Sequence, residues 1–227
     1  PSAPALEAVA SVAAAQPIGL PAFGPRSEVP WRRSGTARRP LSTGAPIDAL
    51  VAAVAAALAA RQEAHDGPVP IRIGIVGQGD AVVPLVADRP GDGETWAGWC
   101  SRMQDASARA RVFAALSVVE QEMLIGKPSG RGRRQLFRVL VEEAHRPGER
   151  PLLNDITVGI DGTSLVATYD DRLLDGEVVD ELLEDVEVLL TLPSGAPVVG
   201  TSRRSVDLVV PMAPEPVDVV AAFLATA

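Results

Sequence analysis

The chain has 227 residues, enough for one large domain or two small ones with a substantial core. Its composition, 47% hydrophobic and 22% charged, is typical of a soluble globular protein. A formal net charge of −8 disfavours nucleic-acid binding, because phosphate neutralisation needs clustered positive charge.

The pattern of apolar residues and cysteines indicates a cytoplasmic protein. The longest apolar run, residues 49–60, is mostly alanine. It is shorter than the roughly 20 residues that span a bilayer, so we expect a buried core helix and no membrane contact. No secretory signal is predicted at the N-terminus. The single cysteine, Cys100, cannot form an intramolecular disulfide and fits a reducing compartment.

The first 45 residues are expected to form an extension and connector. Residues 1–15 are alanine-rich with spacing compatible with a short helix. Residues 16–45 mix prolines with arginines, and each proline removes a backbone donor. The residues concerned are Pro17, Pro21, Pro25, Pro30 and Pro40 with Arg26, Arg32, Arg33, Arg38 and Arg39. We predict an extended connector with a short strand near 38–42. Its arginines are expected to be solvated or paired with carboxylates.

Regular elements begin after the connector. Apolar residues at three- and four-residue spacing predict a helix over 46–64. Alternating isoleucines predict a strand over 71–75 that faces a core on one side, and a second apolar strand follows over 81–87. A long helix with one apolar stripe is then predicted over 94–124, capped by Asp92 or Thr95.

A sheet and a helix complete the predicted domain. Strands are expected over 135–143, 155–160 and 164–169, and Asp161-Gly162 is a strong hairpin signal between the last two. A helix follows over 177–190. Local hairpins combined with helical crossovers favour an α+β fold, an α/β sandwich with helices on a mixed sheet.

The predicted organisation has three parts. Residues 1–45 form the N-terminal extension and connector, 46–192 the folded domain, and 193–227 a Pro-rich linker and tail.

The chain has two histidines, and neither is expected to be catalytic. His65 lies at the end of a predicted helix, where a histidine interacts favourably with the helix dipole. His145 precedes a proline and a glycine and is expected in an exposed loop. Cys100 is interpreted as a small buried apolar residue, the alternative being a nucleophile. Without ligand pairs at metal spacing, no metal site is predicted.

Charged residues in the second half offer two further candidates. The first candidate is a pair of aspartates for acid–base chemistry. The aspartates of this region fall at strand ends and turns, however, where aspartate is favoured because its side chain bonds to its own backbone. They are Asp155, Asp161, Asp170, Asp171 and Asp175. The second candidate is a group of arginines that could bind a phosphate or an acidic carrier protein. The alternative is that these arginines lie in a solvated loop and pair with nearby glutamates. The group comprises Arg131, Arg133, Arg134 and Arg138.

Three segments in the second half occur in a distinctive order. Residues 133–140 read Arg-Arg-Gln-Leu-Phe-Arg-Val-Leu, and 167–175 read Ala-Thr-Tyr-Asp-Asp-Arg-Leu-Leu-Asp. An apolar and acidic helix follows over 179–190. This order resembles the end of a nonribosomal peptide synthetase condensation domain, and a more uneven likeness extends back to residue 46. The resemblance implies the C-terminal one of two chloramphenicol-acetyltransferase-like lobes.

The same resemblance implies that the chemistry is not intact. The family's catalytic His-His-x-x-x-Asp-Gly motif belongs to the other lobe, and His65-Asp66-Gly67 has the wrong spacing for it. Residues 111–117 read Arg-Val-Phe-Ala-Ala-Leu-Ser where the family usually carries a second polar motif. We therefore predict no catalytic, cofactor-binding or metal-binding residue.

Three functions follow from the resemblance. The first is a noncatalytic truncated lobe, a structural or interaction module in nonribosomal peptide biosynthesis. Its partner would be an adenylation domain, a carrier protein or an MbtH-like protein. The second is half of an acyl or peptidyl transferase, completed by a first lobe on another chain or cut from a full domain, with phosphopantetheine on a carrier protein. The third is a standalone relative of acyl-CoA-dependent transferases without activity. Because a lone lobe exposes an apolar face, a homodimer or a bound neighbour is expected.

Overall fold

The computed structural model describes residue 12 and residues 16–17, 34–42, 44–66, 71–76, 82–114, 138–144, 154–171 and 173–198. The helix predicted over 1–15, apart from Val12, lies outside these residues, as does most of the predicted tail over 193–227.

One mixed sheet forms the centre of the described structure. Its strands are β1 (Gln16–Pro17), β2 (Ser34–Pro40), β3 (Ile71–Val76), β4 (Val82–Ala87), β5 (Val139–Ala144), β6 (Ile156–Asp161) and β7 (Ser164–Asp170). The order across the sheet is β1-β3-β5-β6-β7-β2, and β4 pairs with β3. The pairs β1–β3, β3–β5 and β5–β6 are parallel and the other pairs are antiparallel.

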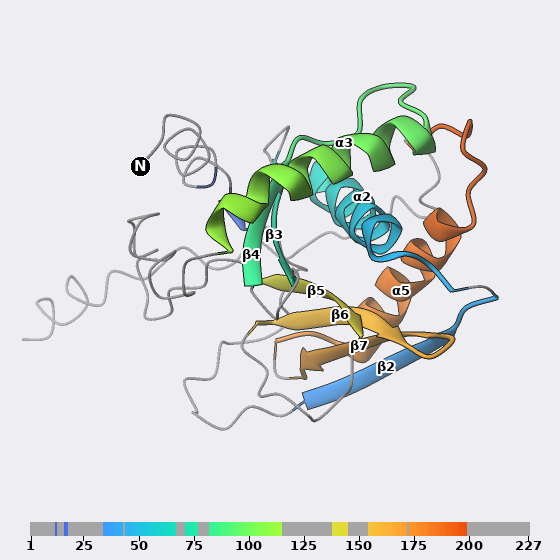
Figure 1. Ribbon diagram of the computed structural model, residues 1–227. Helices are drawn as coiled ribbons and strands as arrows, with labels where there is room; N and C mark the ends of the chain where they lie inside the picture. The colour runs from blue at the N-terminus through green and yellow to red at the C-terminus, as the bar shows by residue number, and fades with distance from the viewer. Residues whose placement is uncertain are drawn as a thin grey trace, which may run out of the picture.

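Helices cover one face of this sheet. They are α2 (Ile47–Asp66), α3 (Trp96–Ala110) and α5 (Gly176–Leu190), and a short 3-10 helix η2 (Arg111–Phe113) extends α3. Figure 1 shows α3 across the top and α2 beneath it, with α5 beside α2 and next to β7 and β2. A mixed sheet packed with helices confirms the predicted α+β fold.

The core lies between the helices and the facing side of the sheet. The alanine-rich middle of α2, residues 50–59, is at most 4% exposed, which confirms the expected buried helix. Every third or fourth residue of α5 is buried, from Val179 to Leu189. Arg61 of α2 binds Asp185 of α5 at 2.6 Å and joins the two helices at the edge of this core. Among the residues that the structure describes, no helix is both long and apolar enough to cross a membrane.

The opposite face of the sheet carries buried polar residues. Strand side chains alternate between the faces, so Ile73 and Ile75 lie in the core while Arg72 points the other way. Arg72, Glu142, Thr157 and Thr168 are only 6–8% exposed. β3 was predicted to face a core on one side, and the burial of Ile73 and Ile75 in the hydrophobic core confirms this. The other face of β3 is shielded from solvent as well, because residues 72–75 are all buried.

The connector contributes a full strand to the sheet. β2 runs over 34–40 and pairs with β7 at seven positions, from Ser34↔Asp170 to Pro40↔Ser164. The strand predicted over 38–42 therefore begins four residues after the observed strand begins and misses its first half. Prolines and arginines obscured it, but both are tolerated at a sheet edge, where N–H groups on the outer side need no partner.

The helix predicted over 94–124 is shorter where it can be followed. α3 ends at Ala110, and the 3-10 turn of η2 ends with Ala114 N–H donating to Arg111 O at 3.0 Å. Residues 115–124 lie outside the described structure. The apolar stripe continues across the change, because Phe113 is 1% exposed. A change from α-helical to 3-10 hydrogen bonding is common at the end of a helix, and the spacing of apolar residues does not reveal it.

Glycines shape the β2–β7 side of the sheet. The β6–β7 hairpin is confirmed, with Asp161 paired to Ser164 and Gly162 at φ +61° beginning the loop. Gly35 of β2 lies under the ring of Tyr169, where an added Cβ would stand 2.4 Å from Tyr169 Cζ. The absence of a side chain at Gly35 therefore makes room for the single tyrosine of the chain.

Candidate functional site

Of the two histidines, the structure describes only the backbone position of His65. His65 is in the last turn of α2, the position that was predicted, at the negative end of the helix dipole. His145 lies outside the described residues, one position after the end of β5. Within the described ranges, no three His, Cys, Asp or Glu residues are close enough to hold a metal ion.

Cys100 lies half-buried on α3 and packs against the hydrophobic core. Burial raises the pKa of its thiol, and the nearby Asp48 carboxylate raises that pKa further. A cysteine nucleophile needs the opposite shift, because the thiolate is the reactive form. This environment suits the predicted role of a small apolar residue.

The candidate aspartates have separate structural contacts. Asp175 is the N-cap of α5, where its Oδ1 accepts a hydrogen bond from Glu177 N–H at 3.0 Å. Asp161 pairs with Arg38 at 2.5 Å on the exposed surface. Asp171 is an exposed turn residue after β7.

Asp155 and Asp170 are the buried members of the set, at 5% and 1% exposure. Their backbones meet where β6 begins and β7 ends, with Asp170 N–H donating to Asp155 O at 2.9 Å. Arg138 Nε donates to Asp155 Oδ2 at 2.5 Å, so one aspartate candidate and one arginine candidate form an ion pair. The partner of Arg138 is thus an aspartate just before β6, where a nearby glutamate was expected. Arg131, Arg133 and Arg134 lie outside the described residues.

The connector arginines that the structure describes are also paired. Arg38 binds Asp161, and Arg39 Nε donates to Glu187 of α5 at 2.9 Å. The expectation that connector arginines pair with carboxylates is confirmed for these two. Both contacts hold the edge strand β2 to its neighbours.

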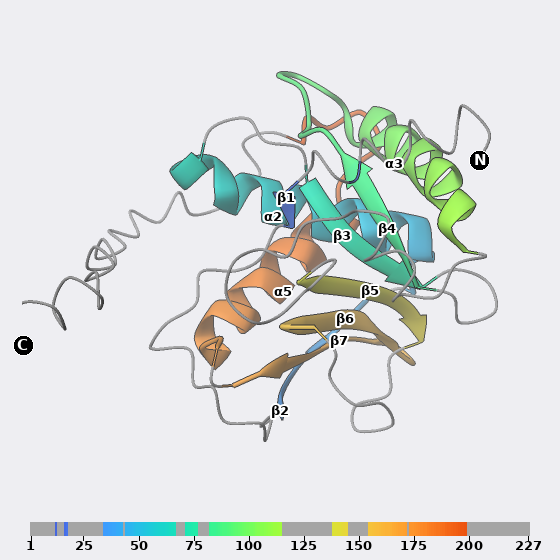
Figure 2. The same ribbon diagram turned by 90° about the vertical axis from the view of Figure 1, so that its left-hand side faces the viewer.

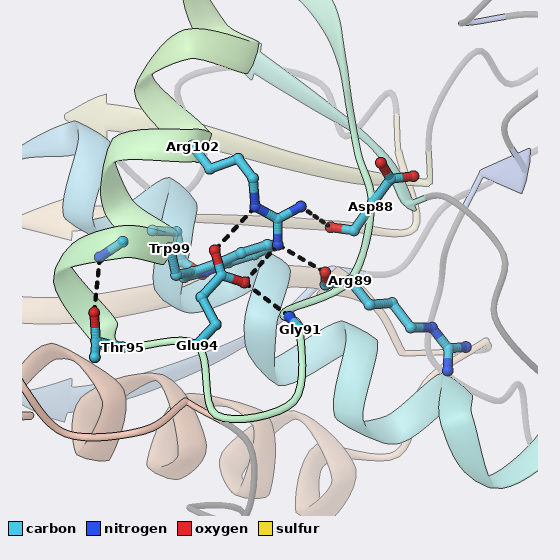
Figure 3. A network of polar contacts seen from close by, with 9 residues as sticks. Asp88, Arg89, Gly91, Glu94, Thr95, Trp99 and Arg102 are labelled. Atoms are coloured by element: carbon cyan, nitrogen blue, oxygen red, sulfur yellow. Dashed lines mark hydrogen bonds and ion pairs between the residues drawn. The ribbon is translucent and has the colours of Figure 1, made fainter.

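The loop between β4 and α3 contains a network of polar contacts (Figure 3). Arg102 donates from Nε to Glu94 Oε1 at 3.0 Å and from Nη2 to Glu94 Oε2 at 2.7 Å. Glu94 Oε2 also accepts the backbone N–H of Gly91 at 2.8 Å. The Arg102 guanidinium lies 4.7 Å from the centre of the Trp99 ring. This network was not predicted, because Glu94 lies in the loop before α3 and the loop, not helical spacing, brings it to Arg102.

The same arginine closes the loop through backbone carbonyls. Arg102 Nη2 donates to Arg89 O at 2.7 Å, and its Nη1 lies 3.4 Å from Asp88 O. Thr95 is the N-cap of α3, where its Oγ1 accepts from Gly98 N–H at 3.2 Å. The sequence predicted either Asp92 or Thr95 as the N-cap of this helix, and the structure shows that it is Thr95.

The chain after α5 returns to the start of α3 (Figure 1). The N–H groups of Trp96 and Ala97 donate to the carbonyls of Ala196 and Ser194, at 2.8 and 3.0 Å. These are N–H groups that a helix leaves without a partner of its own. Residues 193–198, which the sequence placed in the linker, are therefore held on the domain.

The Glu94 carboxylate should make stability in this region depend on pH. Its hydrogen bond from Arg102 is the main cause of a pKa below the ordinary value of 4.5. A lowered folded-state pKa contributes stability that is present above pH 4.5 and is lost as the pH falls through the folded value. We expect Glu94→Gln to lower the free energy of unfolding by about 1 kcal/mol at pH 7. The deficit should shrink below pH 4.5.

Urea denaturation at a series of pH values between neutrality and about 3 measures this deficit. Glu143→Gln, which changes an exposed carboxylate at the end of β5, is the matched control and should show no such pH dependence. A Glu94→Gln deficit that stays constant down to the lowest pH would contradict the assignment.

Solved structures show which known proteins share this fold. No family model matches the chain, and no curated protein matches it by sequence. The X-domain from teicoplanin biosynthesis is similar over 86% of this chain and 55% of that chain, with a TM-score of 0.68 and 15% identity. A variant starter condensation domain of rhizomide synthetase, solved with C8-CoA, is similar over 87% of this chain and 54% of that chain, with a TM-score of 0.57 and 16% identity. This chain has a condensation-domain-like fold.

The same fold occurs within a larger assembly. A four-domain nonribosomal peptide synthetase bound to AMP and glycine matches 83% of this chain and 19% of that chain, with a TM-score of 0.60 and 11% identity. The chain spans about half the length of the separate condensation and X-domains that it matches. Within this condensation-like fold, β5, the β6–β7 hairpin and α5 follow the element order that the sequence resemblance implied.

Proposed function

We propose that this chain is a noncatalytic condensation-like lobe, a structural or protein–protein interaction module in nonribosomal peptide biosynthesis. The main support is the similarity to the X-domain from teicoplanin biosynthesis, which was solved in a complex with OxyB. In that complex the similarity covers 82% of this chain and 52% of the other, with a TM-score of 0.62 and 19% identity. A fold that binds another biosynthetic protein there is a suitable platform for the same kind of role here.

The distribution of histidines supports a role without catalysis. A general base must lie within hydrogen-bond reach of the group that it deprotonates. The two histidines of the chain are far apart in sequence, and His65 is at the end of a helix. Neither occurs in the paired motif that the family resemblance calls for.

The proposed partner is an adenylation domain, a carrier protein or an MbtH-like protein of the same peptide synthetase, in the cytoplasm. Binding by isothermal titration calorimetry tests this directly. We expect one of the three to bind with a Kd of roughly 10 μM or tighter, the strength of a standard-size interface. The sequence also led us to expect that a second copy of the chain could bind the exposed apolar face of the lobe. Light scattering of the chain alone tests for such a homodimer. A monomer that binds none of the three would contradict the proposal.

A second candidate function is half of an amide-forming acyl or peptidyl transferase. It is favoured by the fact that the chain spans about half of a condensation domain that was solved with C8-CoA. A first lobe on another polypeptide would then supply the histidine motif, and a carrier protein the phosphopantetheine. Mixing the chain with such a lobe and loaded carrier proteins should produce amide only if this candidate is right. Binding without amide formation supports the interaction module.

A further inference from the structure

Arg72 is a buried cation on β3, the strand next to the edge strand β4. It lies on β3, on the face opposite the helices, and is 7% exposed. Figure 2 shows β3 between β4 and β5, with the two-residue strand β1 beside its start. Pro17 of β1 is the register partner of Arg72, so β1 lies beside this position.

The guanidinium has an incomplete set of partners. Its Nη1 donates to the backbone carbonyl of Val12 at 2.8 Å, and its Nε is buried without an acceptor. No described carboxylate forms an ion pair with it. Other arginines of the described structure do have carboxylate partners, namely Arg38, Arg39, Arg61, Arg102 and Arg138. Burial lowers the pKa of Arg72, and no anion among the described residues opposes this shift.

An arrangement of this kind is unfavourable in an isolated domain. A charge removed from water needs a counter-charge and a full set of hydrogen bonds, and a neutral carbonyl supplies only one of these bonds. The Nε and Nη2 groups form one two-pronged edge of a guanidinium, and Nη1, on the other side of the group, is the one already bound. Carboxylates and phosphates accept both prongs of such an edge.

We propose that Arg72 binds an oxyanion, a carboxylate or a phosphate, through its Nε/Nη2 edge. Val12 O orients the guanidinium from the opposite side. The described strand beside this position is β1, which pairs with β3 at Gln16↔Ile71 and Pro17↔Arg72.

Thermal unfolding in the presence of inorganic phosphate or acetate, at constant ionic strength, tests this site. A ligand that binds only the folded state stabilises it by mass action. We expect the Tm of the unaltered chain to rise by about 3–5 °C at an anion concentration about ten times its Kd. A larger rise with phosphate assigns the ligand to the phosphate class, and a larger rise with acetate assigns it to the carboxylates.

Three variants make the test specific. Arg72→Met removes the charge at similar length, so it should lose the anion response and should not unfold more easily than the unaltered chain in anion-poor buffer. Arg72→Lys keeps the charge but lacks the two-pronged edge. It should lose most of the response, and it serves as the test if the methionine variant does not fold. Arg109→Met, which changes an exposed arginine of α3, is the control and should keep the full response.

The proposal is overturned if neither anion raises the Tm of the unaltered chain. It is also overturned if the Arg72 variants respond as strongly as Arg109→Met does.

Discussion

Replacing Trp99 by alanine should lower the free energy of unfolding by about 4 kcal/mol. Trp99 is completely buried, and its Nε1 donates to Ala52 O of α2 at 2.8 Å. Its ring also packs under the Arg102 guanidinium. The substitution removes the apolar contact between α3 and α2 and leaves a cavity that the rigid alanine-rich helix cannot close.

Urea denaturation followed by circular dichroism measures this loss, because the substitution removes a fluorophore. Trp99→Phe is the graded control: it keeps an aromatic ring in the same space and loses only the N–H donor and part of the ring. We expect it to cost about 1–2 kcal/mol. If Trp99→Ala costs less than about 1 kcal/mol, α3 does not pack on α2 as described.

Asp155→Ala should lower the free energy of unfolding by about 3 kcal/mol. The Arg138–Asp155 pair is 2.5 Å long, and the side chains are 22% and 6% exposed. Removing one partner leaves the other charge in a partly buried site without compensation, which costs more than the pair itself contributes. The double variant Asp155→Ala/Arg138→Met should therefore regain part of the loss.

A matched exposed pair provides the control for this prediction. Arg38 and Asp161 lie at the same 2.5 Å distance, but their side chains are 49% and 41% exposed. Solvent screening should limit the effect of Asp161→Ala to about 0.5 kcal/mol. Equal losses for Asp155→Ala and Asp161→Ala would show that burial does not distinguish the two pairs.

Elements that depend on neighbouring residues were predictable. The alanine-rich run of α2, the β6–β7 hairpin with its glycine, and the cap at Thr95 all follow from patterns a few residues long. The resemblance that pointed to a condensation-domain lobe also rests on a local order of motifs, and the fold agrees with it.

Features that depend on distant residues were not predictable. β2 became visible only through its pairing with β7, more than a hundred residues later. Arg138 and Asp155 were both candidates, but no local pattern shows that they bind each other. The return of residues 194–196 to the start of α3 is likewise a contact between separate parts of the chain.

The sequence by itself determined the hairpin, the class of fold and the places of the three helices, though not the end of α3. Periodicity, caps and turns act between residues within one or two helical turns. Only the tertiary structure decided which charges are buried and what neutralises them. Desolvation depends on everything packed around a side chain, so Arg72 on β3 reads as an ordinary polar position in a strand until its neighbours are known.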